Sequence, residues 1–148
     1  MAEHTAEVHW IASPHPEQPA TFSRDHTVRL ENGHELLNSS APAYHGNPAA
    51  ANPETLLLAA LASCHMLTFL AIVSKRGYSI ADYSDRAVGT LGKNAEGRMA
   101  ITHCSLNPSV KFLGDNQPTT EELQRFHDSA HRNCFIANTL NCVVEIAI

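Results

Sequence analysis

The chain has 148 residues and a formal net charge of −5. This length fits one domain over residues 1–148, and the charge argues against a general nucleic-acid or anionic-membrane surface. With 43% hydrophobic and 17% charged residues, the composition is that of a globular protein and excludes a disordered one.

Short strands are expected in the first third of the chain. Residues Thr5–Ala12 alternate loosely between polar and apolar side chains, and a proline-rich turn follows. The segments His26–Leu30 and His34–Asn38 flank Glu31-Asn32-Gly33, in which Asn-Gly is a strong hairpin signal. We therefore predict a hairpin here, followed by a loop over residues 39–51.

A long helix is predicted from Pro53 to Arg76. Asn52 is a favourable N-cap, and proline is tolerated at the first helical position because its missing N–H would be unpaired there anyway. Gly77 is a natural residue just past the C-terminal end. The 18 residues Leu56–Val73 carry no charge, which is also typical of a membrane span. We favour a helix buried in a globular core, and its apolar character on all sides indicates a dimer that covers it.

The rest of the chain predicts two strands, a helix and a last strand. Ser79–Leu91 and Arg98–Phe112 are the two strands, with Pro108 expected at a bulge or an edge. Thr119-Thr120-Glu121-Glu122 is a capping-box sequence that opens a helix through about Arg132. Asn141–Ile148 alternates as a final strand. The order of elements predicts an α+β domain.

Four cysteines carry the candidate chemistry: Cys64, Cys104, Cys134 and Cys142. The chain begins without the basic start and apolar segment of a signal peptide, so we expect a soluble cytoplasmic protein in which structural disulfides are uncommon. Cys104 and Cys142 fall in predicted strands and are interpreted as packed thiols. Cys64 lies mid-helix, where the dipole gives a thiolate little help, so a reactive Cys64 would need a nearby cation.

Cys134 lies where the second helix should end, and a thiol at such a boundary can move more easily than one in a strand. It is either a resolving cysteine or a packed thiol. A competing hypothesis is a zinc site, because His127, His131 and Cys134 share a helical face and Cys64 could be a fourth ligand. The spacing lacks the close ligand pairs that would make it specific.

Three segments resemble the OsmC-like family, which includes the organic hydroperoxide reductases. Asn52-Pro53-Glu54 through Ser63-Cys64 is similar to the family's Asn-Pro-Glu helix segment that leads to the first cysteine, with the glutamate ten residues before the cysteine (64 − 54 = 10). Asn133-Cys134-Phe135-Ile136 is similar to the second-cysteine segment, where many members have proline in place of Phe135. Phe22-Ser23-Arg24-Asp25 is similar to the turn that carries the family's arginine.

The resemblance implies a fold and a mechanism. The fold would be an intertwined homodimer in which antiparallel sheets wrap long central helices. Cys64 would attack a small organic hydroperoxide, or hydrogen peroxide, and Cys134 would form a disulfide with it, in defence against oxidative stress. Arg24 would stabilise the Cys64 thiolate and Glu54 would orient Arg24, with Arg29 as the rival arginine. A dithiol of the lipoyl type would reduce the disulfide, and no cofactor is implied.

Other functions stay open at this point. An OsmC-fold protein could bind a ligand or act on another electrophile, and the metal-binding hypothesis remains. His65 follows the first cysteine and could modulate its reactivity. The sequence leaves the roles of His65, His127 and His131 undecided, as it does the natural peroxide.

Overall fold

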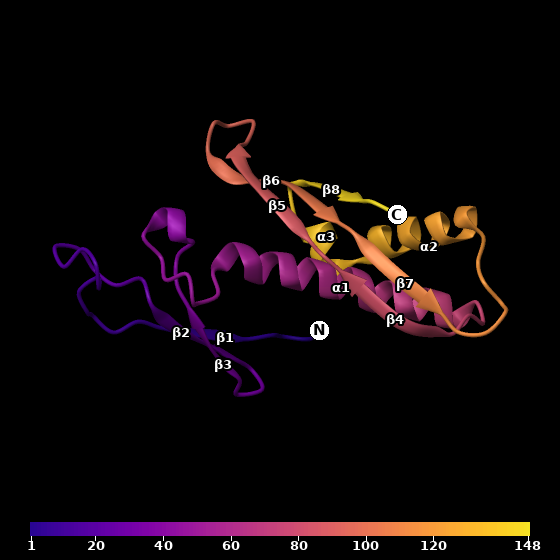
Figure 1. Ribbon diagram of the computed structural model, residues 1–148, viewed down its shortest axis with the longest axis horizontal. Coiled ribbons are helices and arrows are strands. Elements are labelled where there is room, and N and C mark those ends of the chain that lie inside the picture. Colours follow the sequence, from indigo (N-terminus) through magenta and orange to yellow (C-terminus); the bar gives the residue numbers. More distant parts are fainter. The chain divides into compact units, whose positions relative to one another are not determined.

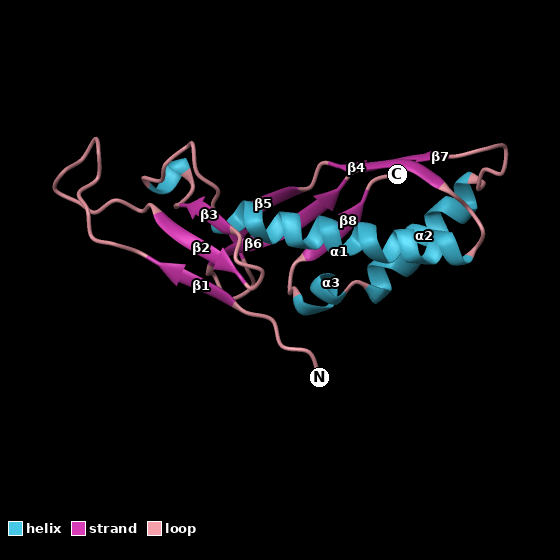
Figure 2. Cartoon of the chain, turned by 90° about the horizontal axis from the view of Figure 1, so that it is seen from below, coloured by secondary structure: helices cyan, strands magenta, loops and turns pink.

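The computed structural model describes residues 1–148, which form two compact units, Met1–Leu56 and Leu57–Ile148. Figure 1 shows the elements in chain order and Figure 2 shows them by type. The chain is α+β, with its strands and helices grouped along the sequence. In chain order the elements are β1 (Ala6–His9), β2 (His26–Leu30), β3 (Glu35–Asn38), a 3₁₀ turn (Pro42–Tyr44), α1 (Pro53–Lys75), β4 (Ile80–Asp85), β5 (Val88–Lys93), β6 (Met99–Leu106), β7 (Pro108–Phe112), α2 (Thr120–Asn133), α3 (Phe135–Thr139) and β8 (Val143–Ile146).

The first unit contains a three-stranded antiparallel sheet in the order β1-β2-β3. The predicted hairpin is confirmed, with Val28 opposite Leu36. Gly33 has φ 86° at its turn, a left-handed conformation that glycine adopts without steric cost. The predicted first strand is shorter than expected, because only Ala6–His9 pairs with β2.

The long helix α1 begins and ends as its capping residues predict. The Asn52 Oδ1 atom accepts a hydrogen bond from the Thr55 N–H at 2.9 Å, which is the N-cap interaction. At the other end, Gly77 has φ 83° and the Tyr78 N–H donates to the Val73 carbonyl. The helix stops at Lys75, one residue before the predicted end.

In the second unit, each long predicted strand is divided in two. The expected strand Ser79–Leu91 becomes β4 and the first part of β5, and the expected strand Arg98–Phe112 becomes β6 and β7. Asn107 marks the break, where its N–H donates to Asp85 Oδ1 at 2.7 Å and Pro108 opens β7. Proline lacks an N–H and suits the first position of a strand. The two parts of each predicted strand therefore belong to two separate sheets, β4-β7 and β5-β6-β8.

The expected antiparallel sheets are confirmed, and one strand pair within them is parallel. β8 runs parallel to β6, with Cys104 opposite Val144. Between β7 and β8 the chain passes through α2 and α3, and a helical crossover of this length is what a parallel pair requires. β8 spans only Val143–Ile146, so Cys142 lies just before the strand in which it was predicted.

The capping box predicted for α2 is confirmed. Thr119 Oγ1 accepts from the Glu122 N–H at 3.1 Å, and the Glu122 carboxylate accepts from the Thr119 N–H at 2.9 Å. The five-residue helix α3 was not predicted. Its N-cap is the Cys134 Sγ atom, which accepts from the Ala137 N–H at 3.4 Å, and cysteine is not among the residues that signal a cap.

The core of the second unit has two apolar clusters. One surrounds Leu61, Cys104, Leu106 and Cys134, and the other surrounds Phe69, Val73, Phe126 and Ala130. On α1 the buried residues recur every fourth position, as Leu61, His65, Phe69 and Val73, which is one face of a helix. The other residues of this apolar helix are partly buried or exposed in the single chain.

Candidate active site

Cys64 projects from the middle of α1 and Cys134 from the end of α2. Cys64 is partly buried and Cys134 is fully buried. The Cys64 side chain packs against the cluster that contains Cys134. The structure therefore brings together the two cysteines that the sequence singled out, and both are free thiols.

The surroundings of Cys134 favour the neutral thiol. Burial, with a smaller effect of the adjacent Cys64 thiol, raises the pKa of Cys134 to about 11, although the Ala137 N–H partly opposes this rise. Cys134 closes α2 and opens α3. The prediction that it lies at the end of the second helix is confirmed.

Arg24 belongs to the first unit and is held by its own neighbours. Its guanidinium lies over the Phe22 ring, 4.0 Å from the centroid, and donates to Thr21 Oγ1 at 3.2 Å and to the Phe22 carbonyl. Phe22 is therefore a partner of Arg24 that the sequence did not reveal.

Glu54 and Arg24 form no ion pair with each other in the single chain. The Glu54 Oε2 atom is buried and has no hydrogen-bond partner, which is costly for a carboxylate oxygen. The rival Arg29 is already engaged, because it binds Glu35 across the hairpin at 3.0 Å.

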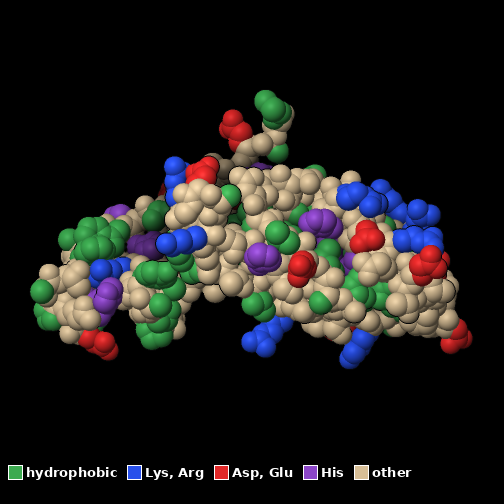
Figure 3. Space-filling model, turned by 90° about the horizontal axis from the view of Figure 1, so that it is seen from above, with side chains coloured by type: hydrophobic (Ala, Val, Ile, Leu, Met, Phe, Trp, Pro, Cys, Tyr) green, Lys and Arg blue, Asp and Glu red, His purple; other side chains and the backbone are tan.

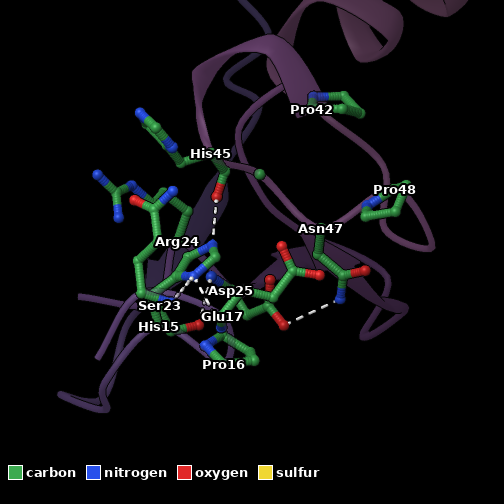
Figure 4. Close-up of a pocket in the computed structure, with 12 residues that line it drawn as sticks. His15, Pro16, Glu17, Ser23, Arg24, Asp25, Pro42, His45, Asn47 and Pro48 are labelled. Carbon is green, nitrogen blue, oxygen red and sulfur yellow. Dashed lines mark hydrogen bonds between the residues drawn. The ribbon is translucent and has the colours of Figure 1, made fainter. Parts of the chain in front are cut away.

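Arg24 lines a cavity of about 450 Å³ in the first unit. Figure 4 shows His15, Asp25 and His45 around the same cavity. Asp25 accepts a hydrogen bond from Asn47 at 3.0 Å, and His15 Nε2 contacts the His45 carbonyl at 3.1 Å. Glu17 also lines the cavity, so its lining residues include an arginine, two acidic residues and two histidines.

A buried histidine pair links α1 to α2 next to the cysteines. His65 Nε2 and His127 Nδ1 share a hydrogen bond of 3.0 Å, and each residue is only 1% exposed. The His127 ring also stacks on Phe69, with centroids 4.1 Å apart. Burial lowers the pKa of both histidines to about 4, with the nearby His131 adding to the effect at His65 and His65 adding to it at His127. Both rings are therefore neutral at physiological pH.

The sequence left the role of His127 undecided, and the structure shows that it is a buried residue. Its partner could have been found from spacing, because His65 lies in the same every-fourth-residue series as Leu61 and Phe69. The hypothesis of a zinc site at His127, His131 and Cys134 is not supported, because no group of three or more His, Cys, Asp or Glu side chains is arranged to hold a metal ion. His127 instead directs its Nδ1 atom to His65.

Comparison with known proteins identifies a family and a similar solved structure. The family described as OsmC-like protein matches residues 45–148. An OsmC-like protein of unknown function from Vibrio cholerae is 39% identical, with a TM-score of 0.93 over 100% of this chain and 99% of that one. No curated protein matches the chain.

Two more distant structures share the fold. An organic hydroperoxide resistance protein from Legionella pneumophila is 18% identical, with a TM-score of 0.73 over 99% of this chain and 94% of that one. The organic hydroperoxide resistance protein OhrB of Bacillus subtilis is 22% identical, with a TM-score of 0.67 over 96% of each chain.

Proposed function

The chain belongs to the OsmC-like protein family, and we propose that it is a thiol peroxidase that reduces organic hydroperoxides. The observation that carries the proposal is the packing of the Cys64 side chain against the cluster that contains Cys134. The substrate class is supported by relatives of the same fold that are named organic hydroperoxide resistance proteins. We further propose that the protein acts in the cytoplasm, where its thiols return to the reduced state.

The proposed reaction needs two thiols and one peroxide. The Cys64 thiolate attacks one oxygen of the O–O bond, the bond breaks, and the other oxygen takes up a proton and leaves as an alcohol. Cys64 is then a sulfenic acid. Cys134 attacks its sulfur, water leaves, and a Cys64–Cys134 disulfide forms. A small dithiol of the lipoyl type returns both cysteines to thiols by exchange.

The environment of the two cysteines favours this division of roles. With a pKa raised to about 11 by burial, Cys134 is almost entirely protonated at neutral pH and is a poor first nucleophile. Its place between α2 and α3 favours local movement towards Cys64, since element ends open more easily than element centres. Cys64 lies on a rigid helix, which suits a nucleophile that must be held in place.

Activation of Cys64 calls for a cation, and we propose Arg24, oriented by Glu54. Ten residues separate Glu54 from Cys64 on α1, which is about 15 Å along the helix axis. One guanidinium cannot contact both groups of the same helix over that distance. A homodimer resolves this, because Glu54 of the partner subunit can then lie beside the Cys64 of the first. The unpartnered Glu54 Oε2 atom supports this arrangement.

Two single substitutions test the proposal. Cys64→Ser should abolish the consumption of cumene hydroperoxide, because no other group attacks the O–O bond. Cys134→Ser should react once and stop, leaving one sulfenic acid that dimedone labels, whereas the first product in the wild type should be a Cys64–Cys134 disulfide. Ser63→Ala is the matched control on the exposed side of α1. Dimedone labelling of Cys134 in Cys64→Ser would reverse the roles.

A ligand-binding function is the second candidate, and the 450 Å³ cavity around Arg24 favours it. If wild type and both cysteine variants consume peroxide at the same background rate, the peroxidase proposal fails. Binding of a small anion that is lost in Arg24→Ala would then support the cavity as the functional site.

A further inference from the structure

Cys104 and Cys142 form a second pair of neighbouring thiols in the chain. The Sγ atoms of Cys104 and Cys142 lie 3.7 Å apart. Cys104 belongs to the centre of the cluster that holds Cys134, and both Cys64 and Cys142 pack against that cluster. All four thiols of the chain therefore lie in one apolar cluster.

Cys142 packs against the cluster that contains Cys134 and lies close to Cys134 along the chain. Cys134 immediately precedes α3, and Cys142 follows that helix within three residues, in a bend before β8. Eight positions separate them in the chain (142 − 134 = 8). Cys142 is partly exposed, whereas Cys104 is only 1% exposed. A residue in a bend between two short elements moves at lower cost than one within a strand.

We propose that Cys104 and Cys142 are a second redox dithiol, which receives the oxidising equivalents of the Cys64–Cys134 disulfide by thiol–disulfide exchange. This inference rests on the proposed function for its physiological oxidant. It adds a step in which the disulfide bond is transferred from Cys64–Cys134 to Cys104–Cys142. Cys64 is then a thiol again before any external dithiol reacts.

The exchange balances without a further reactant. The Cys142 thiol loses its proton and attacks Cys134 Sγ, and the Cys64–Cys134 bond breaks, so that Cys64 takes up a proton as a thiol. Cys104 then loses its proton and attacks Cys142 Sγ, and Cys134 leaves and is protonated. Two thiols have been oxidised and two sulfurs of the first disulfide reduced.

The order of attack follows from the environments of the two thiols. Burial, followed by the adjacent Cys142 thiol, raises the pKa of Cys104 to about 11. Few Cys104 thiolates exist at neutral pH, so Cys142 makes the first attack and Cys104 completes the exchange once Cys142 is linked. The partly exposed Cys142 is also the sulfur that an external dithiol meets.

The test follows the disulfides over time in the full-length protein. One equivalent of cumene hydroperoxide should give the Cys64–Cys134 disulfide first and the Cys104–Cys142 disulfide later, as mapped by non-reducing peptide mass spectrometry. Two equivalents should remove all four free thiols of the wild type and only two in Cys142→Ala. Cys104 and Cys142 that stay free after the first disulfide has formed would overturn the proposal.

Three controls make the result specific. Val144→Ala loosens the same cluster without removing a thiol and should still lose four thiols. Cys104→Ala should repeat the result of Cys142→Ala, which guards against a folding defect in either variant. In Cys134→Ser, one peroxide equivalent should give no Cys104–Cys142 disulfide, and a disulfide that forms there at the wild-type rate would exclude exchange through Cys134.

Diamide separates this inference from the proposed function, because it oxidises dithiols without peroxide. If peroxide leaves every thiol free while diamide yields a Cys104–Cys142 disulfide that depends on Cys134, the peroxidase proposal fails and the exchange stands. If diamide and peroxide both yield only Cys64–Cys134, the exchange fails and the peroxidase proposal stands.

Discussion

At the scale of single residues, the neighbours of the two candidate arginines favour one of them as the proposed partner of Cys64. Arg29 is bound to Glu35 on an exposed hairpin, whereas Arg24 lines a cavity and lies over Phe22. The ion pair with Glu35 holds the Arg29 guanidinium on the hairpin, whereas Arg24 forms no ion pair within the chain. Arg24 is therefore the better candidate on structural grounds as well as by resemblance.

Removal of the Arg24 charge should slow the reaction of Cys64. In Arg24→Ala we expect the alkylation of Cys64 near pH 7 to slow by about an order of magnitude, because the thiolate is the form that reacts and it loses its stabilising cation. Iodoacetamide labelling followed by mass spectrometry measures the rate. Arg29→Ala should label as the wild type does, and the opposite ranking of the two variants would assign the role to Arg29.

At the scale of elements, the capping box stabilises α2, the helix that ends at Cys134. Thr119→Ala removes the side-chain acceptor of the Glu122 N–H, and loss of such a cap costs about 1 kcal/mol of stability. Urea unfolding monitored by circular dichroism measures the change. Thr120→Ala is the control, because it keeps both capping-box hydrogen bonds. Equal effects of the two substitutions would mean that the cap contributes nothing.

Local signals predicted the elements well where they act through the backbone. The Asn-Gly turn, the Asn52 cap and the Thr119–Glu122 box each specify their own hydrogen bonds, and all three are present in the structure. These signals depend on residues within a few positions, so they are readable before the chain folds.

Features that depend on distant partners were missed. The break at Asn107 requires Asp85, and the parallel placement of β8 requires β6. The His65–His127 hydrogen bond joins residues 62 positions apart. Cys64 and Cys134 were singled out only because their flanking motifs resemble a family, since a mid-helix cysteine is by itself typical of a packed core residue.

At the scale of the whole molecule, the uncovered surface of α1 calls for a partner. By length and composition α1 could cross a membrane, with a mean hydropathy of 2.3 over an 18-residue stretch that is 22% buried, but a core helix of a soluble protein meets the same test.

Figure 3 shows apolar side chains among the charged ones on the surface of the chain. Leu67 on α1 remains 60% exposed and Phe135 on α3 83% exposed. A second copy of the chain would cover such residues, as the proposed homodimer requires.

A charge on the exposed side of α1 tests the dimer. Leu67→Glu should leave a monomer almost unaffected, because the side chain faces solvent there, but it should bury a carboxylate in a dimer and weaken association. Light scattering at micromolar concentration should show about twice 16.1 kDa for the wild type and a shift towards one copy for the variant. Ser63→Glu is no substitute, since it lies beside Cys64. A wild-type mass of one copy would exclude the dimer.

The stability of the whole molecule should fall in mild acid because of the buried histidine pair. In the folded chain the pKa of His65 and of His127 is lowered to about 4, while both titrate near 6.5 when unfolded. Between these values the unfolded state binds protons that the folded state does not, so stability decreases as the pH falls from 6.5 towards 4 and levels off below. At pH 5 each histidine should account for about 2 kcal/mol of this loss.

Urea unfolding at pH 7.5 and pH 5 measures this loss of stability. His127→Leu should weaken the pH dependence, whereas substitution of the exposed His34 should leave it unchanged. An unchanged slope in His127→Leu would show that the acid sensitivity arises elsewhere.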